Sequence, residues 1–193
     1  MLNISGWLRG RSKISKTAAE LYGSIVAQAR QPAFYTHYRV PDVAEKRYEM
    51  IVLHMVMVLE RLRAAGDNGG QVAQGLVETF VGDLDGSIRE MAIGDPKVPT
   101  HVKKAAAGLL DRDVLYRQTF IAGRDGSTDD TSNGDDMTLR ALLSELLFDD
   151  NDATNAEAME RYVLASRASL QAWSLEDADA GLTFARPDDF RTG

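Results

Sequence analysis

The chain has 193 residues, 44% of them hydrophobic, and a formal net charge of −7 at pH 7. This length suits one domain with a sizeable buried core. The absence of cysteine excludes disulfides, thiolate metal sites and cysteine nucleophiles. The acidic total argues against sequence-specific nucleic acid as a partner, because that needs a basic surface. An acid-rich chain without cysteine is expected in the cytoplasm.

Charge is distributed unevenly along the chain. Residues 1–40 contain six Arg or Lys against one Glu, whereas residues 125–193 contain sixteen Asp or Glu against five Arg. This asymmetry predicts differently charged regions. We therefore expect a basic, flexible N-terminal arm (residues 1–14), a helical domain (residues 15–174) and a loose, acidic C-terminal tail (residues 175–193).

The first expected helix spans residues 15–30, where apolar side chains recur at helical spacing. An aromatic connector follows at residues 34–41, and we expect it to be non-helical because residues before a proline favour extended backbone. Phe34, Tyr35 and Tyr38 of this connector are residue types favoured at binding hot spots. Two interpretations stay open: these rings form a docking surface, or they cover one end of the bundle.

The second helix is expected over residues 42–65. Asp42 with Glu45 three positions later resembles a capping box at its start. Residues 50–59 are apolar on every side of the helix, which predicts the buried central helix of the fold.

The rest of the chain continues the helical pattern. The expected elements are a third helix (70–93), a fourth (100–122), a flexible acidic loop (123–136), a fifth helix (137–148) and a sixth that opens at residue 154. Thr100 and Thr154 are good N-terminal caps for the fourth and sixth helices. The sequence therefore predicts an all-α, single-domain bundle of about six helices with short loops.

Charged residues form stripes on the second and third helices. Arg47, His54 and Arg61 are spaced by seven residues, which places them on one face of a helix. Two acidic pairs on the third helix share this spacing, Glu78 with Asp85 and Asp83 with Glu90. If the helices pack antiparallel, the stripes can meet. They then form either an internal salt-bridge network that fixes helix register or a charged groove that receives a partner peptide.

Metal and cofactor motifs are weak or absent. No pair of histidines has the spacing of a zinc site, and no glycine pattern for phosphate is present. The loop at residues 129–134 resembles the start of a calcium loop, but its twelfth position is Arg140 where a glutamate is needed. We therefore expect no metal and no cofactor. Two alternatives stay open: a metal-dependent all-α enzyme that uses Asp83, Asp85 and Glu90, and a membrane-surface adaptor that acts through its basic N-terminus.

One ordered set of residues carries a family resemblance over about residues 15–112, most specifically between Phe80 and Lys104. The set comprises Leu21-Tyr22, Phe34-Tyr35, Val40-Pro41-Asp42, Arg47-Tyr48-Glu49, Leu53-His54, Phe80, Asp83-Leu84-Asp85, Ile88-Arg89-Glu90-Met91, Gly94-Asp95, Val98-Pro99 and Lys103-Lys104. In this order, the residues resemble the ubiquinol–cytochrome c chaperone family, in a bacterial form.

The resemblance implies a non-enzymatic assembly factor for the cytochrome bc1 complex. Its expected partner is newly made cytochrome b or an early bc1 intermediate. It also implies a small companion protein and contact with the inner membrane or the ribosome, on the cytoplasmic side. Together with the connector and the stripes, it yields an expected partner-binding set: Phe34, Tyr35, Tyr38, Arg47, His54, Arg61, Asp83, Asp85, Arg89, Glu90, Asp95, Lys103 and Lys104.

Overall fold

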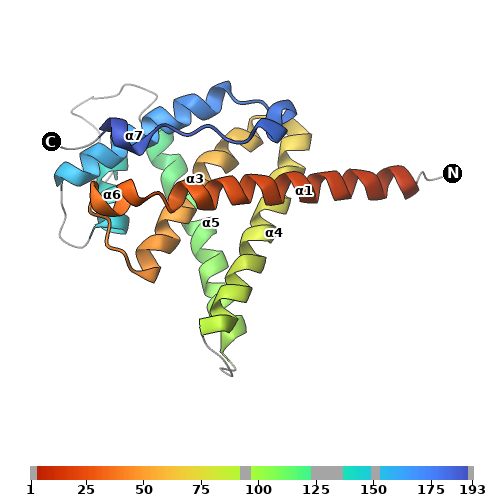
Figure 1. The fold of residues 1–193 in the computed structure, drawn as a ribbon, viewed down its shortest axis with the longest axis horizontal. Helices are drawn as coiled ribbons and strands as arrows, with labels where there is room; N and C mark the ends of the chain where they lie inside the picture. Colours follow the sequence, from red (N-terminus) through yellow and green to blue (C-terminus); the bar gives the residue numbers. More distant parts are fainter. Residues whose placement is uncertain (1–3, 92–96, 123–136, 149–152, 191–193) are drawn as a thin grey trace.

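A computed structural model describes residues 4–91, 97–122, 137–148 and 153–190 (Figure 1). Within these ranges every regular element is a helix, which confirms the predicted all-α, single-domain bundle. The elements are α1 (Ile4–Ala29), α2 (Pro32–Thr36), α3 (Ala44–Arg63), α4 (Gly66–Met91), α5 (Val98–Ala122), α6 (Leu139–Leu147), α7 (Ala153–Ala172) and the 3₁₀ helices η1 (Leu175–Ala180) and η2 (Pro187–Phe190). The loop expected at residues 123–136 lies outside the described residues.

Helix α3 is the centre of the fold, as its apolar sequence predicted. Every residue from Val52 to Leu59 is buried, and the helix contacts α1, α4, α5, α6 and α7. Lys46, in the first turn of α3, links this helix to α6: its ammonium donates a hydrogen bond to the carbonyl of Leu146 at the end of α6 (3.2 Å). The burial of this helix on all sides anchors the remaining elements.

Several element boundaries differ from the prediction. Pro32 begins the short helix α2, because proline fits the first turn of a helix, so the expectation of a wholly non-helical connector is wrong. Asp42 does not cap α3: Val43 occupies the cap position without a side-chain hydrogen bond. Helix α5 begins at Val98, so Thr100 lies inside its first turn. Helix α1 already begins at Ile4, within the region assigned to the N-terminal arm.

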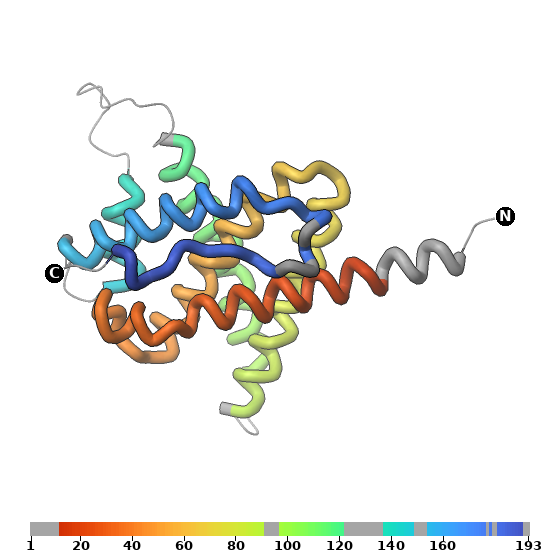
Figure 2. Tube along the Cα trace, turned by 45° about the horizontal axis from the view of Figure 1, so that its top comes forward, coloured from red at the N-terminus to blue at the C-terminus, as the bar shows by residue number. Residues whose placement is uncertain are grey.

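The C-terminal segment, residues 175–190, is packed rather than loose. It runs between α1 and α7 (Figure 2). The hydroxyl of Tyr38 donates to the carbonyl of Pro187 (2.7 Å), and the backbone N–H of Ala185 donates to the hydroxyl of Ser166 (3.2 Å). Its apolar side chains cover the core: Leu175, Ala178, Leu182, Phe184, Ala185 and Phe190. The acidic composition of this segment predicted a loose tail and gave no indication of these contacts.

Helices α4 and α5 form a long hairpin whose distal part extends away from the body (Figure 1). Tyr48 of α3 fixes the base of this hairpin, because its hydroxyl donates to the carbonyl of Ala105 (2.6 Å) and its ring lies 6.2 Å from that of Phe80. At the other end of α4, the chain reverses sharply at Gly66, whose positive φ of 71° favours glycine. The hairpin therefore projects its distal surface from a rigid base.

Candidate partner-binding surface

The charged stripe of α3 does not meet the acidic stripe of α4. Arg47 pairs with Asp42 on the segment that precedes its own helix, with a guanidinium-to-carboxylate distance of 3.0 Å. The Nε of Arg61 donates to the carbonyl of Trp173 (2.8 Å), at the end of α7. The expected contact between the two stripes, as a salt-bridge network or as a groove, is therefore wrong. Seven-residue spacing showed that these residues share a face, but not that this face points toward α7 and the connector.

His54 belongs to the core. It is completely buried, its Nδ1 lies 2.7 Å from the carbonyl of Met50, and its Nε2 lies 2.7 Å from the hydroxyl of Tyr162. The carbonyl can only accept, so Nδ1 carries the proton and Nε2 accepts from the tyrosine. Burial lowers the pKa of His54 to about 4. The imidazole is thus neutral at neutral pH and serves as a hydrogen-bonded core residue.

The aromatic connector covers one end of the bundle. Phe34 and Tyr38 are 0% and 1% exposed, and the Phe34 ring packs edge-on against His54 and Tyr162 at 5.6 and 4.9 Å. The docking interpretation of Phe34, Tyr38 and His54 is corrected accordingly, because these side chains have no free surface here. Tyr35 is half-buried, and its ring lies 5.8 Å from the guanidinium of Arg47.

Six of the predicted partner-binding residues lie together on the α4–α5 hairpin. We call them the hairpin surface. They are Asp83, Asp85, Arg89, Glu90, Lys103 and Lys104. All are exposed except Asp85, which is partly exposed. A seventh predicted residue, Asp95, lies outside the described residues.

The charges of the hairpin surface are only locally neutralised. Asp85 forms an i,i+4 ion pair with Arg89 (2.6 Å), and this guanidinium lowers the pKa of the Asp85 carboxyl. Asp83 accepts a hydrogen bond from the hydroxyl of Tyr22 (2.7 Å). Glu90, like Lys103 and Lys104 on the opposite arm, forms no ion pair with any described residue. The hairpin therefore exposes carboxylates on α4 and ammonium groups on α5.

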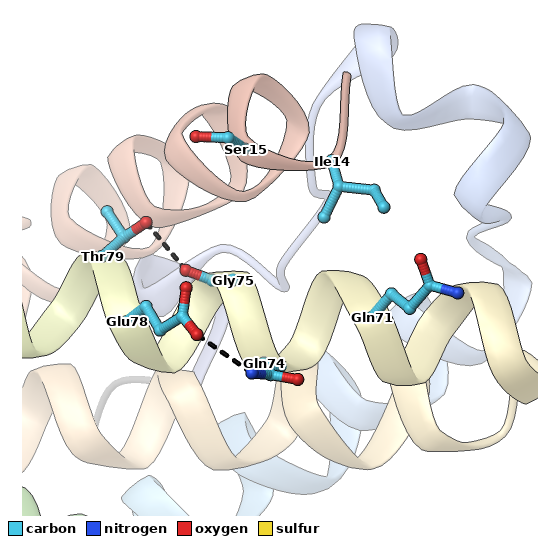
Figure 3. A pocket seen from close by; sticks show the side chains of 7 residues that line it. All are labelled: Ile14, Ser15, Gln71, Gln74, Gly75, Glu78 and Thr79. Atoms are coloured by element: carbon cyan, nitrogen blue, oxygen red, sulfur yellow. Dashed lines mark hydrogen bonds between the residues drawn. The ribbon is translucent and has the colours of Figure 1, made fainter. Parts of the chain in front are cut away.

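Among the described residues, open pockets lie beside α1, where it faces α4 and the residues that follow α7. One pocket has a volume of about 600 Å³. Figure 3 shows two hydrogen bonds within its wall: Gln74 donates to Glu78 (3.0 Å), and Thr79 donates to the carbonyl of Gly75 (2.9 Å). A neighbouring pocket of about 560 Å³ is flanked by Lys13 and Arg61.

Comparison with known proteins identifies the family. The family model described as ubiquinol-cytochrome C chaperone matches residues 36–181. The chain belongs to the ubiquinol-cytochrome C chaperone family. The crystal structure of the Cbp3 homolog from Brucella abortus is similar over 96% of this chain and 98% of that chain, with 31% sequence identity and a TM-score of 0.77. No curated protein matches the chain.

These findings confirm the resemblance that the sequence carried, including its likeness to a bacterial protein. The family match includes the whole α4–α5 hairpin and residues 175–181 of the C-terminal segment. The hairpin surface is therefore part of the family's own domain and not an addition to it.

The described residues do not support the alternative of a metal-dependent member of this fold. They contain no group of three or more His, Asp or Glu placed to hold a metal ion. Asp83 and Asp85 are instead engaged with Tyr22 and Arg89, respectively. Among the same residues, none of the helices combines the length and apolar character needed to cross a membrane.

Sequence reasoning missed two features of the hairpin. The first is a partly buried ion pair at its base, where Arg112 of α5 binds both carboxylate oxygens of Glu49 on α3 (2.9 and 3.2 Å). Because Arg112 and Glu49 are 63 positions apart in the sequence, no local pattern indicated that they form a pair. The second is an exposed apolar face of α5 at Leu110, Val114 and Ile121. Its 3–4 spacing was present in the sequence but could not be distinguished from a core-facing pattern.

Proposed function

We propose that this chain is a non-enzymatic chaperone for assembly of the cytochrome bc1 complex. It holds newly made cytochrome b, or an early intermediate that contains it, by the hairpin surface. The observation that carries the proposal is the coincidence of family membership with a projecting element on which three exposed charges, those of Glu90, Lys103 and Lys104, form no ion pair with any described residue. Such a surface is suited to reversible binding, because its charges need not break a buried network first.

The acidic arm of the hairpin fits the chemistry of such a client. Loops of membrane proteins on the cytoplasmic side are enriched in Lys and Arg. The last two and a half turns of α4 carry three carboxylates, those of Asp83, Asp85 and Glu90. These groups can attract basic loops of a newly made chain. Electrostatic attraction of this kind raises association rates and selects the partner.

The proposed place of action follows from the client. The basic loops of a newly made membrane protein lie at the cytoplasmic face of the inner membrane, so we place the chain there, in the cytoplasm or peripherally bound. A small companion protein and the ribosome remain predicted partners from the resemblance. The exposed Lys103 and Lys104 are suited to acidic segments of such partners.

A deletion strain tests the function. Removal of the gene is expected to lower the amount of assembled bc1 complex, measured from the reduced-minus-oxidised spectrum of cytochrome b in membranes and from native gel electrophoresis. The wild-type chain restores both signals, and the Asp85→Lys variant restores them poorly. A deletion strain with normal bc1 levels during respiratory growth would contradict the proposal.

A further inference from the structure

One face of α5 carries an exposed heptad pattern. Six residues at successive spacings of four and three all lie at the surface. They are Lys103, Ala107, Leu110, Val114, Arg117 and Ile121. We call this row the α5 seam. Side chains at such spacing form a narrow stripe, which is the geometry of a coiled-coil contact.

The apolar members of the seam are unusually exposed for their type. Leu110 and Ile121 each expose 61% of their surface, and Val114 exposes 46%. Helix α5 already buries a different face against the body through Leu109, Tyr116 and Phe120. The seam is therefore not needed for the core, and large aliphatic side chains in a contiguous exposed row indicate an interaction site.

The charges of the seam specify the partner. Lys103 has no ion pair with any described residue. Arg117 shares the buried carboxylate of Asp113 with Arg63, at distances of 3.2 and 2.7 Å, so two cations face one anion. No carboxylate occupies a seam position. The seam thus presents an apolar centre with a surplus positive charge at two points that are fourteen residues, or two heptads, apart.

We infer that the α5 seam docks an amphipathic α-helix of a partner protein, with carboxylates two heptads apart that face Lys103 and Arg117. The seam extends over about 27 Å, the length of roughly five helical turns. A membrane span of the client is apolar on all sides and would leave most of its surface uncovered on so narrow a stripe. A second copy of this chain is also a poorer match, because an α5–α5 contact would bring together seams of the same charge sign.

Site-specific photocrosslinking in cells tests this inference with the full chain. Benzoylphenylalanine is placed at Leu110 or at Val114, and Leu164 of α7, which is 49% exposed, is the matched control away from the seam. We expect both seam positions to crosslink to the same partner segment, and the control to give none of that product. The crosslinked peptide, mapped by mass spectrometry, is expected to lie on an amphipathic helix with the stated carboxylate spacing.

Two exposed lysines test the role of charge. Lys103→Glu is expected to lower the yield of the Leu110 crosslink about fivefold, which is the effect of replacing one exposed ion pair by a repulsion. Lys16→Glu makes the same chemical change on α1, outside the α5 seam and the hairpin surface, and is expected to leave the yield unchanged. Circular dichroism of both variants confirms that the fold is intact.

Three outcomes would overturn the inference. The first is equal crosslinking from the seam and from Leu164, and the second is equal loss in the two lysine variants. The third is a mapped target that is a lipid, a second copy of this chain or a uniformly apolar membrane span. The client proposal has a separate readout, because recovery of cytochrome b through the acidic arm of α4 does not depend on the identity of the α5 partner.

Discussion

Buried His54 makes the stability of the fold depend on pH in a calculable way. Its pKa is about 4 in the folded protein, against 6.5 for an unperturbed histidine, because burial disfavours the charged ring. Above pH 6.5 the imidazole is neutral in both the folded and unfolded chains and adds no pH dependence. As the pH falls from 6.5 to 4, the unfolded chain binds a proton that the folded protein excludes, so the free energy of unfolding decreases.

The size of the effect follows from the two pKa values. Their difference corresponds to about 3 kcal/mol at and below pH 4, and to about 2 kcal/mol between pH 7 and pH 5. For a domain of this length, 2 kcal/mol lowers the unfolding temperature by about 4–8 °C. The change is large enough to measure by urea or thermal unfolding monitored by circular dichroism.

The control is His54→Gln, in which the side chain keeps a donor and an acceptor but does not titrate in this range. The variant is expected to be less stable at pH 7, because packing and hydrogen-bond geometry change. Its stability should nevertheless fall less steeply between pH 7 and pH 5, by about 2 kcal/mol relative to the wild type. Contributions from all other residues are common to both proteins and cancel in this difference. Identical slopes for the two proteins would refute the assignment of His54 as a neutral core residue.

Two further predictions concern the fold. Gly82→Ala is expected to raise the free energy of unfolding by about 0.5–1 kcal/mol, because alanine favours a helix and its Cβ meets no atom within 4 Å. Gly108→Ala is expected to lower it, because the new Cβ would lie 2.7 Å from the hydroxyl of Tyr48, and urea unfolding of the pair compares the two signs. Arg47→Glu is expected to leave the urea unfolding midpoint unchanged, because Arg47 and its partner Asp42 are both exposed; a variant that unfolds would show that the pair is structural.

The fold could be predicted wherever the local pattern and the tertiary environment agreed. An apolar run on every side identified α3 as the central helix, because only burial on all sides satisfies such a segment. Thr138 caps α6 by accepting a hydrogen bond from the N–H of Ala141 (3.2 Å), close to the start expected for that helix. The C-terminal segment was missed because its apolar residues, Phe184 and Phe190 among them, follow no helical or strand periodicity that would indicate where they pack.

The candidate site was predictable only in part, for a similar reason. Helical spacing showed that Arg47, His54 and Arg61 share a face, but not which neighbour that face meets. Tyr162 and Trp173, which satisfy two of these residues, are more than a hundred positions away. The hairpin surface was found through the family resemblance, whose most specific block spans the distal ends of α4 and α5. Only the structure shows that the α5 seam is exposed, because a heptad pattern that faces the core and one that faces a partner look the same in the sequence.

Recovery of newly made cytochrome b with the tagged chain tests the central claim most directly. Cells are pulse-labelled during bc1 synthesis, and labelled cytochrome b is measured in the purified fraction for the wild type, Asp85→Lys and Asp67→Lys. Asp67 lies eighteen residues before Asp85 on α4, so five helical turns separate the two on the same face. We expect labelled cytochrome b with the wild type and with Asp67→Lys, and a clear loss with Asp85→Lys. No labelled cytochrome b or other bc1 subunit with the wild-type chain, or equal recovery with all three proteins, would contradict binding of the client by the hairpin surface.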